Sequence, residues 1–159
     1  MRKITISQDA SDKSPKSDSW LDLDRIATVE ISSEDSNFPI EHALGQAETM
    51  GWRAAGTGPQ RIRLLFDTPQ TIRRIYLHFV DQTSERSQEF ALMVMMENEL
   101  REVVRQQWNF SPHGTTEEIE DYKLELNGVT ALELRIDPDR SHDPKQSQHV
   151  ASLQRLRLA

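Results

Sequence analysis

Two stretches of alternating hydrophobicity in the middle of the chain constrain its fold most. In residues 61–66 and again in 74–79, a large apolar side chain occupies every second position. A period of two residues sends successive side chains to opposite faces of a β-strand, so one face enters a core while the other meets water. The sequence predicts two antiparallel strands separated by a turn at 67–69, and their inward set is Ile62, Leu64, Phe66, Ile75, Leu77 and Phe79.

Short strand-like runs separated by turn residues continue along the rest of the chain. Residues 90–96 are apolar in both phases, which predicts a central strand covered on both sides. Leu100, Val103 and Val104 also fit one face of a helix, so 97–107 is either a strand or a short helix. Further strands are expected at 101–108, 121–127, 130–136 and 151–158.

This pattern favours an all-β fold, an antiparallel β-sandwich or jelly roll. The 159 residues have the length of one domain. We expect a single sandwich domain over 20–159. Residues 7–19 are polar without apolar periodicity, so 1–19 is interpreted as a flexible arm, with room for a short edge strand at 3–6.

Composition argues against several classes of partner. The chain has 19 basic and 26 acidic residues, a net charge of -7, which gives no global field favouring nucleic acid or an anionic membrane surface. It contains no cysteine, so disulfides, thiol nucleophiles and thiolate zinc sites are absent. No apolar segment follows the basic start at Arg2-Lys3, and we therefore expect a cytoplasmic protein.

Catalytic signatures are missing. The sequence has no Gly-x-Ser-x-Gly elbow, no phosphate-binding Gly-x-x-x-x-Gly-Lys loop and no His-Glu-x-x-His pair. The acidic run 117–121 is interpreted as the solvated edge of a strand, with Thr115 and Glu118 forming a capping box. His142 and His149 are interpreted as solvated loop residues. We therefore expect no catalytic residue and no enzyme activity.

Several short motifs resemble the discoidin family, also called coagulation factor 5/8 type C or galactose-binding-like domains. They are Ser32-Ser33, Ala43-Leu44 and Trp52, followed by the paired strands described above. The resemblance implies a β-sandwich that recognises its ligand through loops at one end. In the family these loops use acidic or histidine residues ahead of the tryptophan and an arginine further on. The positions here that match are Glu41, His42, Trp52, Arg53 and Arg86.

The function that follows is a non-catalytic carbohydrate-binding module. A sugar has an apolar face and a rim of hydroxyl groups, so its site needs an exposed aromatic platform beside fixed polar groups. Trp52 is either that platform or a plug at the end of the core. The alternative is an intracellular protein-interaction domain on the same fold, so the expected partner is a carbohydrate or a protein.

Many discoidin-like domains hold a structural calcium ion, but the acidic positions that they use are not filled here. Ala43-Leu44 is followed by Gly45-Gln46, and the last strand begins Val150-Ala-Ser-Leu153. Calcium needs several oxygen ligands, usually including carboxylates. We therefore expect the protein to fold without metal or cofactor, and its thermal midpoint to be unchanged by EDTA. A midpoint that falls with EDTA and recovers with calcium would contradict this.

Overall fold

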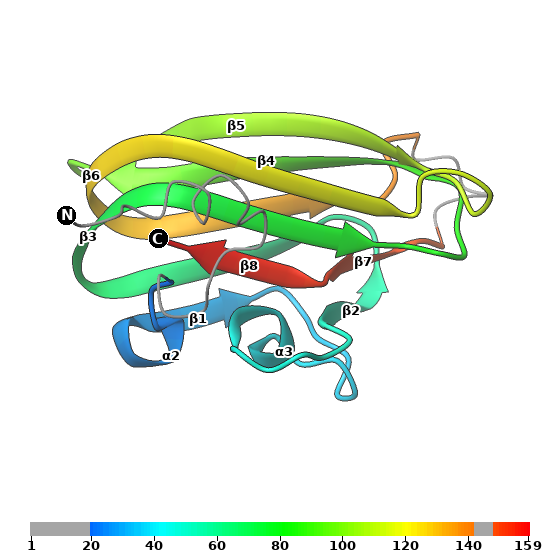
Figure 1. The fold of residues 1–159 in the computed structure, drawn as a ribbon, viewed down its shortest axis with the longest axis horizontal. Coiled ribbons are helices and arrows are strands. Elements are labelled where there is room, and N and C mark those ends of the chain that lie inside the picture. Colours follow the sequence, from blue (N-terminus) through cyan, green and yellow to red (C-terminus); the bar gives the residue numbers. More distant parts are fainter. Residues whose placement is uncertain (1–19, 142–147) are drawn as a thin grey trace, which may run out of the picture.

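The structure is a computed structural model that describes residues 20–141 and 148–159. Strands dominate it, and the helical elements are single turns (Figure 1). The elements are α2 (Leu23–Ile26), β1 (Ala27–Ile31), α3 (Glu41–Leu44), β2 (Trp52–Thr57), β3 (Gln60–Val80), β4 (Arg86–Met96), β5 (Glu99–Phe110), β6 (Glu117–Asp137), β7 (Val150–Leu153) and β8 (Arg155–Leu158).

Two long bent strands, β3 and β6, join the two layers of the sandwich. Along 60–65, β3 pairs with the last part of β6, and 62–66 pairs with β1. Along 74–80, β3 pairs with the first part of β6, and 75–78 pairs with β8. These strands form one six-stranded sheet of the order β1-β3-β6-β4-β5, in which β8 also pairs with β3, and β2 and β7 form a separate two-stranded sheet. The large layer contains β1, β4, β5 and the adjoining parts of β3 and β6, and the small layer contains β8 with the other parts of β3 and β6. The all-β antiparallel sandwich expected from the sequence is therefore the observed fold class.

The turn predicted at 67–69 and the break between the strands predicted at 121–127 and 130–136 are bends inside β3 and β6, which corrects the division into shorter strands. The register of β3 against β6 shifts between Leu65 and Arg74, where the chain crosses from one layer to the other. Gly128 has φ +69°, a conformation that costs glycine little and other residues more. Turn-forming residues here bend a continuous strand instead of ending it.

The predicted core is confirmed. Ile62, Leu64, Ile75, Leu77 and Phe79 are at most 1% exposed. Phe66 lies at the border at 9%. They pack between the layers with apolar residues from β4, β6, β7 and β8. The period-two pattern therefore identified the buried face of β3 in both layers.

The region after β4 is a hairpin, so the helical alternative for 97–107 is wrong. Met96 pairs with Glu99, and the two residues between them have positive φ values of 54° for Glu97 and 59° for Asn98. Two central residues with positive φ form the hairpin turn whose twist matches that of the flanking strands. This local geometry leads directly into β5, which pairs with β4 along its length.

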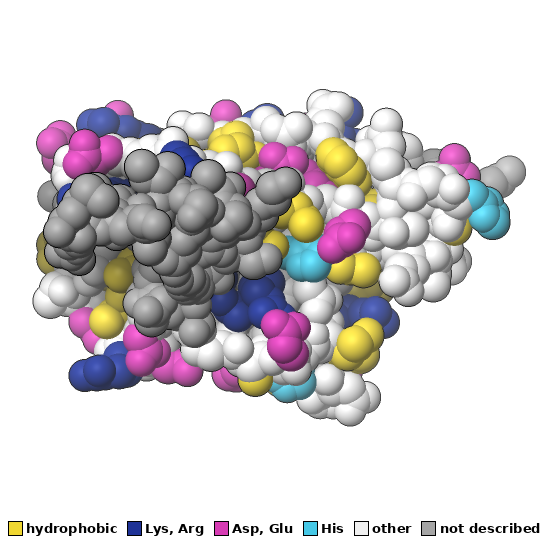
Figure 2. All heavy atoms as spheres, in the orientation of Figure 1, with side chains coloured by type: hydrophobic (Ala, Val, Ile, Leu, Met, Phe, Trp, Pro, Cys, Tyr) yellow, Lys and Arg dark blue, Asp and Glu magenta, His cyan; other side chains and the backbone are white. Residues whose placement is uncertain are grey.

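The predicted arm at 1–19 lies outside the described residues. Within the described part, no helix is long and apolar enough to cross a membrane. On the face shown in Figure 2, basic and acidic side chains are interspersed over the small layer. Arg74 and Asp121 pair at 2.6 Å, and Arg155 and Glu48 at 3.1 Å. In these described parts of the chain, opposite charges therefore lie next to each other.

Candidate functional site

A cavity of about 390 Å³ lies where loops gather at one end of the sandwich. This is the right-hand end in Figure 1, where β3 ends and β7 lies. The end of β3, the loop before β4, the start of β2 and the segment 148–154 all contribute. Its lining includes Met50, Trp52, Arg53, Gln82, Thr83, Ser84, Arg86, Gln148, His149, Ser152 and Gln154. The predicted loops 34–60 and 81–88 thus meet at one cavity.

The turn before β2 is fixed to the β7–β8 junction and carries an exposed apolar side chain. Gly51 has φ +79°, and a Cβ added there would lie 2.4 Å from the carbonyl oxygen of Leu153. The side-chain amide of Gln154 donates a hydrogen bond through Nε2 to the carbonyl oxygen of Thr49 at 2.6 Å. Met50 is nevertheless 74% exposed. The turn is therefore held in place while it presents the methionine to solvent at the cavity.

Trp52 is a core residue and not a ligand platform. It is 1% exposed, and its Nε1 donates a hydrogen bond to the carbonyl oxygen of Ser33 at 3.1 Å. A stacking platform must leave one ring face open, and this ring has none. Of the two roles that the sequence left open for Trp52, the structure shows the core plug.

Arg53, the next residue in β2, points the other way and is exposed. Its guanidinium lies 4.6 Å from the centroid of the Phe38 ring. Backbone bonds hold this arrangement, since Arg53 N donates to Phe38 O at 3.1 Å and Asp35 N donates to Arg53 O at 2.8 Å. Arg53 keeps its predicted place at the cavity, and its role in binding stays a prediction.

Glu41 and His42 lie in α3 and are not among the residues that line the cavity. Glu41 is exposed, and His42 is partly buried. The carbonyl oxygen of His42 accepts a hydrogen bond from Thr49 Oγ1 at 2.9 Å. The structure therefore places His42 behind the turn that carries Met50, and these two predicted residues do not meet Arg53 at the cavity wall.

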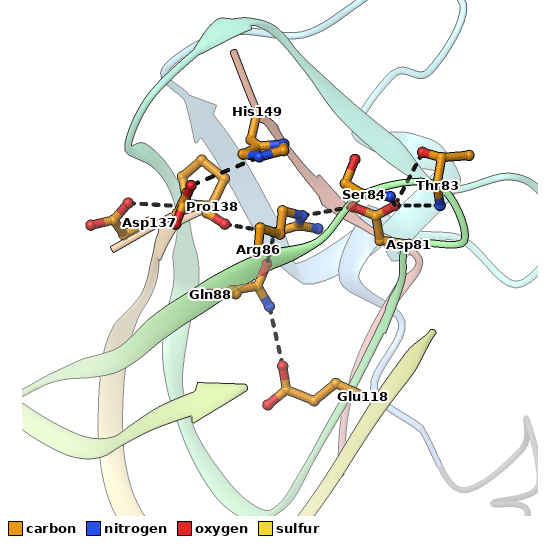
Figure 3. A network of polar contacts seen from close by, with 10 residues as sticks. Asp81, Thr83, Ser84, Arg86, Gln88, Glu118, Asp137, Pro138 and His149 are labelled. Atoms are coloured by element: carbon orange, nitrogen blue, oxygen red, sulfur yellow. Dashed lines mark hydrogen bonds and ion pairs between the residues drawn. The ribbon is translucent and has the colours of Figure 1, made fainter. Parts of the chain in front are cut away.

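Arg86 is buried at the base of the loop that precedes β4. Its Nε donates to Asp81 at 2.6 Å, and its Nη1 donates to Gln88 at 3.0 Å and to the carbonyl oxygen of Pro138 at 2.9 Å (Figure 3). The guanidinium also lies 4.5 Å from the centroid of the Phe110 ring. With a side chain only 1% exposed, Arg86 supports the cavity from beneath.

Asp81 couples this arginine to the loop backbone. Its Oδ1 accepts hydrogen bonds from the N–H groups of Thr83 and Ser84, both at 3.0 Å. Burial alone would raise the pKa of Asp81, but the bonds from Arg86 and from the loop lower it below its usual value. Asp81 is therefore ionised at neutral pH and holds the loop 82–85 against the sandwich.

The same network continues inward to a buried acid (Figure 3). Gln88 Nε2 donates to Glu118 Oε1 at 3.1 Å, and both residues are fully buried. Glu118 Oε2 has no hydrogen-bond partner among the described residues. Burial, followed by the nearby Glu120 carboxylate, raises the pKa of Glu118 to about 8. The prediction that residues 117–121 form a solvated edge and that Thr115 and Glu118 make a capping box is therefore wrong at Glu118, which lies in β6.

This buried acid predicts a loss of stability toward alkaline pH. In the folded protein Glu118 stays protonated up to about pH 8, whereas in the unfolded chain it loses its proton near pH 4.5. In this window the folded state binds more protons, so the free energy of unfolding falls as pH rises, by at most about 1.4 kcal/mol per pH unit. Urea melts between pH 5 and 9 measure the slope. Glu118→Gln is expected to flatten it, and an unchanged slope in that variant would exclude Glu118 as its source.

Sequence reasoning missed the polar residues that complete the cavity. Gln148, His149, Ser152 and Gln154 come from the end of the chain, about 100 positions after Trp52. β2 pairs with β7, which brings Trp52 opposite Leu153. Nothing in the local pattern indicates this long-range pairing. Met50 could have been identified as a candidate from the sequence, because it is an apolar residue next to a glycine in a polar loop.

The described residues contain no group of three or more acidic or histidine side chains placed to hold a metal ion. His149 lies in the cavity wall with its Nε2 3.8 Å from Asp139. His142 lies outside the described residues. The expectation that the protein folds without calcium stays a prediction.

No protein-family model and no curated protein sequence matches the chain. Solved structures match its fold. The third CBM32 module of a family 31 glycoside hydrolase from Clostridium perfringens aligns with a TM-score of 0.62 at 17% identity, over 91% of this chain and 98% of that one. The family 32 carbohydrate-binding module of C. perfringens NanJ, in complex with galactose, aligns with a TM-score of 0.60 at 14% identity. This match covers 87% of this chain and 96% of that one.

A further match is the CBM32 of AlyQ, in complex with 4,5-unsaturated mannuronic acid. It aligns with a TM-score of 0.59 at 18% identity, over 84% of this chain and 95% of that chain. Because the sequence identities are only 14–18%, these matches show a shared fold and do not show a shared function. The chain has the β-sandwich fold of family 32 carbohydrate-binding modules, which is the galactose-binding-like fold that discoidin domains share.

Proposed function

We propose that this chain is a non-catalytic carbohydrate-binding module of the discoidin type, which binds a glycan in the loop-end cavity. One observation carries the proposal. At the loop end of a galactose-binding-like sandwich, a cavity of about 390 Å³ combines an exposed apolar side chain with a ring of hydrogen-bonding groups. This volume falls in the range of small-ligand sites, which is about 300–1,000 Å³.

The chemistry of the wall suits a sugar. Amides of Gln82, Gln148 and Gln154 and hydroxyls of Thr83 and Ser152 line the cavity, and such groups both donate and accept hydrogen bonds as sugar hydroxyls require. Sugar binding replaces water hydrogen bonds almost one for one, so the net gain is small. The expected dissociation constant is of the order of high micromolar to millimolar.

The structural neighbours support a binding role without catalysis. Those named above are carbohydrate-binding modules, and two were solved with a sugar bound. In a structure of AlyQ that contains CBM32 and alginate lyase domains, the match covers only 31% of that chain. The unit resembling this protein is therefore one part of that enzyme chain, beside its lyase domain.

A glycan array followed by titration of the best ligand tests the proposal. Arg53→Ala is expected to weaken binding about tenfold or more, because it removes a charged donor whose hydrogen bonds contribute roughly 1.5–3 kcal/mol. Arg61→Ala is the matched control. Arg61 is also exposed and lines a different cavity, over the large layer.

The result separates three cases. Loss of affinity in Arg53→Ala but not in Arg61→Ala supports the cavity as the site. Equal binding by both variants and by wild type means that the glycan binds elsewhere on the molecule. No binding to any glycan on the array, by wild-type protein whose circular dichroism spectrum shows a folded β structure, would overturn the proposed function.

A further inference from the structure

We infer that the glycan is acidic: Arg53 pairs with the carboxylate of a uronic-acid residue, and Met50 packs against the apolar face of its ring. This inference rests on the proposed function and narrows it to one class of sugar.

Arg53 differs from most arginines of the described chain in having no carboxylate partner. Arg63, Arg105 and Arg155, for example, each form an ion pair with a glutamate. Within the ranges 20–141 and 148–159, no acidic side chain comes within ion-pair distance of the Arg53 guanidinium. An acidic ligand would supply the missing partner.

Three acids of the loop that precedes β2 have other partners. Glu34 accepts a hydrogen bond from the backbone N–H of Ile40 at 2.9 Å. Asp35 accepts one from the backbone N–H of Asn37, also at 2.9 Å. Glu48 pairs with Arg155 at 3.1 Å. These carboxylates thus hold other parts of the structure and form no ion pair with Arg53.

A cation–π contact with Phe38 positions Arg53 without using its donors. The guanidinium carbon lies over the ring, 4.6 Å from its centroid. The N–H bonds of a guanidinium lie in its plane, so they remain available to a ligand. Two of them match the two oxygens of a carboxylate, a geometry that adds specificity as well as energy.

Two of the charged residues that line the cavity offset each other. Asp81 and Arg86 form an ion pair at 2.6 Å. Arg53 adds a further, exposed positive charge to the lining, although the whole chain has a net charge of -7. An exposed cation without a carboxylate partner favours an anionic sugar over its neutral counterpart.

Met50 supplies the apolar contact that the buried Trp52 does not. It is 74% exposed at the cavity lip, on a turn fixed by Gly51. A thioether side chain is polarisable and adapts its shape to the surface that it meets. Carbon–hydrogen bonds on one face of a pyranose ring offer such a surface, and a uronic acid keeps this face while adding a carboxylate.

Titration with matched sugar pairs, followed by NMR, tests this inference. Methyl galacturonoside is compared with methyl galactoside, and methyl mannuronoside with methyl mannoside, since each pair differs only at C6. In at least one pair the uronoside is expected to bind at least ten times more tightly at 50 mM NaCl. Salt at 500 mM is expected to reduce this preference, because the site is open to solvent.

Variants separate the two contacts. Arg53→Gln is expected to abolish the preference for the uronoside while keeping residual binding to both sugars, and Arg53→Lys is expected to retain part of it. Met50→Ala is expected to weaken both members of a pair by a similar factor. Equal affinity for uronoside and neutral glycoside in wild type, or a preference that survives Arg53→Gln, would overturn the inference and leave carbohydrate binding standing. Failure of every glycan on the array would instead remove the proposed function itself.

Discussion

Replacing Trp52 with alanine is expected to destabilise the folded protein by about 3–5 kcal/mol, the range for deleting a large buried aromatic side chain. The ring is 1% exposed and belongs to the central cluster of apolar residues. Its removal would open a cavity that the neighbouring strands can only partly fill, and would leave the carbonyl oxygen of Ser33 without its donor. Equilibrium urea unfolding measures the change.

Trp52→Phe separates packing from hydrogen bonding. Phenylalanine restores most of the apolar surface but cannot donate to Ser33, so this variant is expected to lie between wild type and Trp52→Ala. Where Trp52→Ala still folds, its glycan affinity is expected to fall less than that of Arg53→Ala. A variant of normal stability that has lost glycan binding would show that Trp52 contacts the ligand after all.

The core of the sandwich could be predicted from the sequence because its signal is local. Alternation at Ile62, Leu64, Phe66 and at Ile75, Leu77, Phe79 needs only neighbouring positions, and these six side chains are buried in the structure. The same reasoning failed at the two bends. Asp67-Thr68-Pro69 and Asn127-Gly128 each indicate a turn locally, but only the pairing of β3 with β6 on both sides of each bend shows that the strand continues.

The candidate site was harder to predict because it depends on contacts between distant segments. The burial of Trp52 follows from its position opposite Leu153 in β7, a pairing between segments about 100 residues apart in the sequence. Arg53 and Arg86 have the same residue type in the sequence, yet one is exposed and the other is surrounded by Asp81, Gln88 and Pro138. Residue type predicts the chemistry that is available, and burial decides which residue can offer it to a ligand.

Removing the buried arginine gives the second large effect: Arg86→Ala is expected to cost about 3–5 kcal/mol of folding stability. The substitution leaves the ionised Asp81 without its partner and removes the donor to Gln88 and to the Pro138 carbonyl oxygen. Thermal and urea unfolding measure the loss. Arg101→Ala is the matched control, because the Arg101 side chain is 48% exposed and pairs with Glu99, which is 68% exposed, so a change within about 0.5 kcal/mol is expected.

The partner substitution shows whether the loss comes from the pair or from the space that the arginine fills. Asp81→Asn in the Arg86→Ala background removes the uncompensated charge, so the double variant is expected to recover part of the stability that the single variant lost. Arg86→Lys keeps a positive charge but loses the planar fork that reaches three acceptors, and is expected to be intermediate. Because the side chain of Arg86 is 1% exposed, these variants should change glycan affinity only as far as they loosen the loop 82–85. A loss of binding in Arg86→Lys without any loss of stability would show instead that the guanidinium reaches the ligand, as the resemblance to discoidin domains implied.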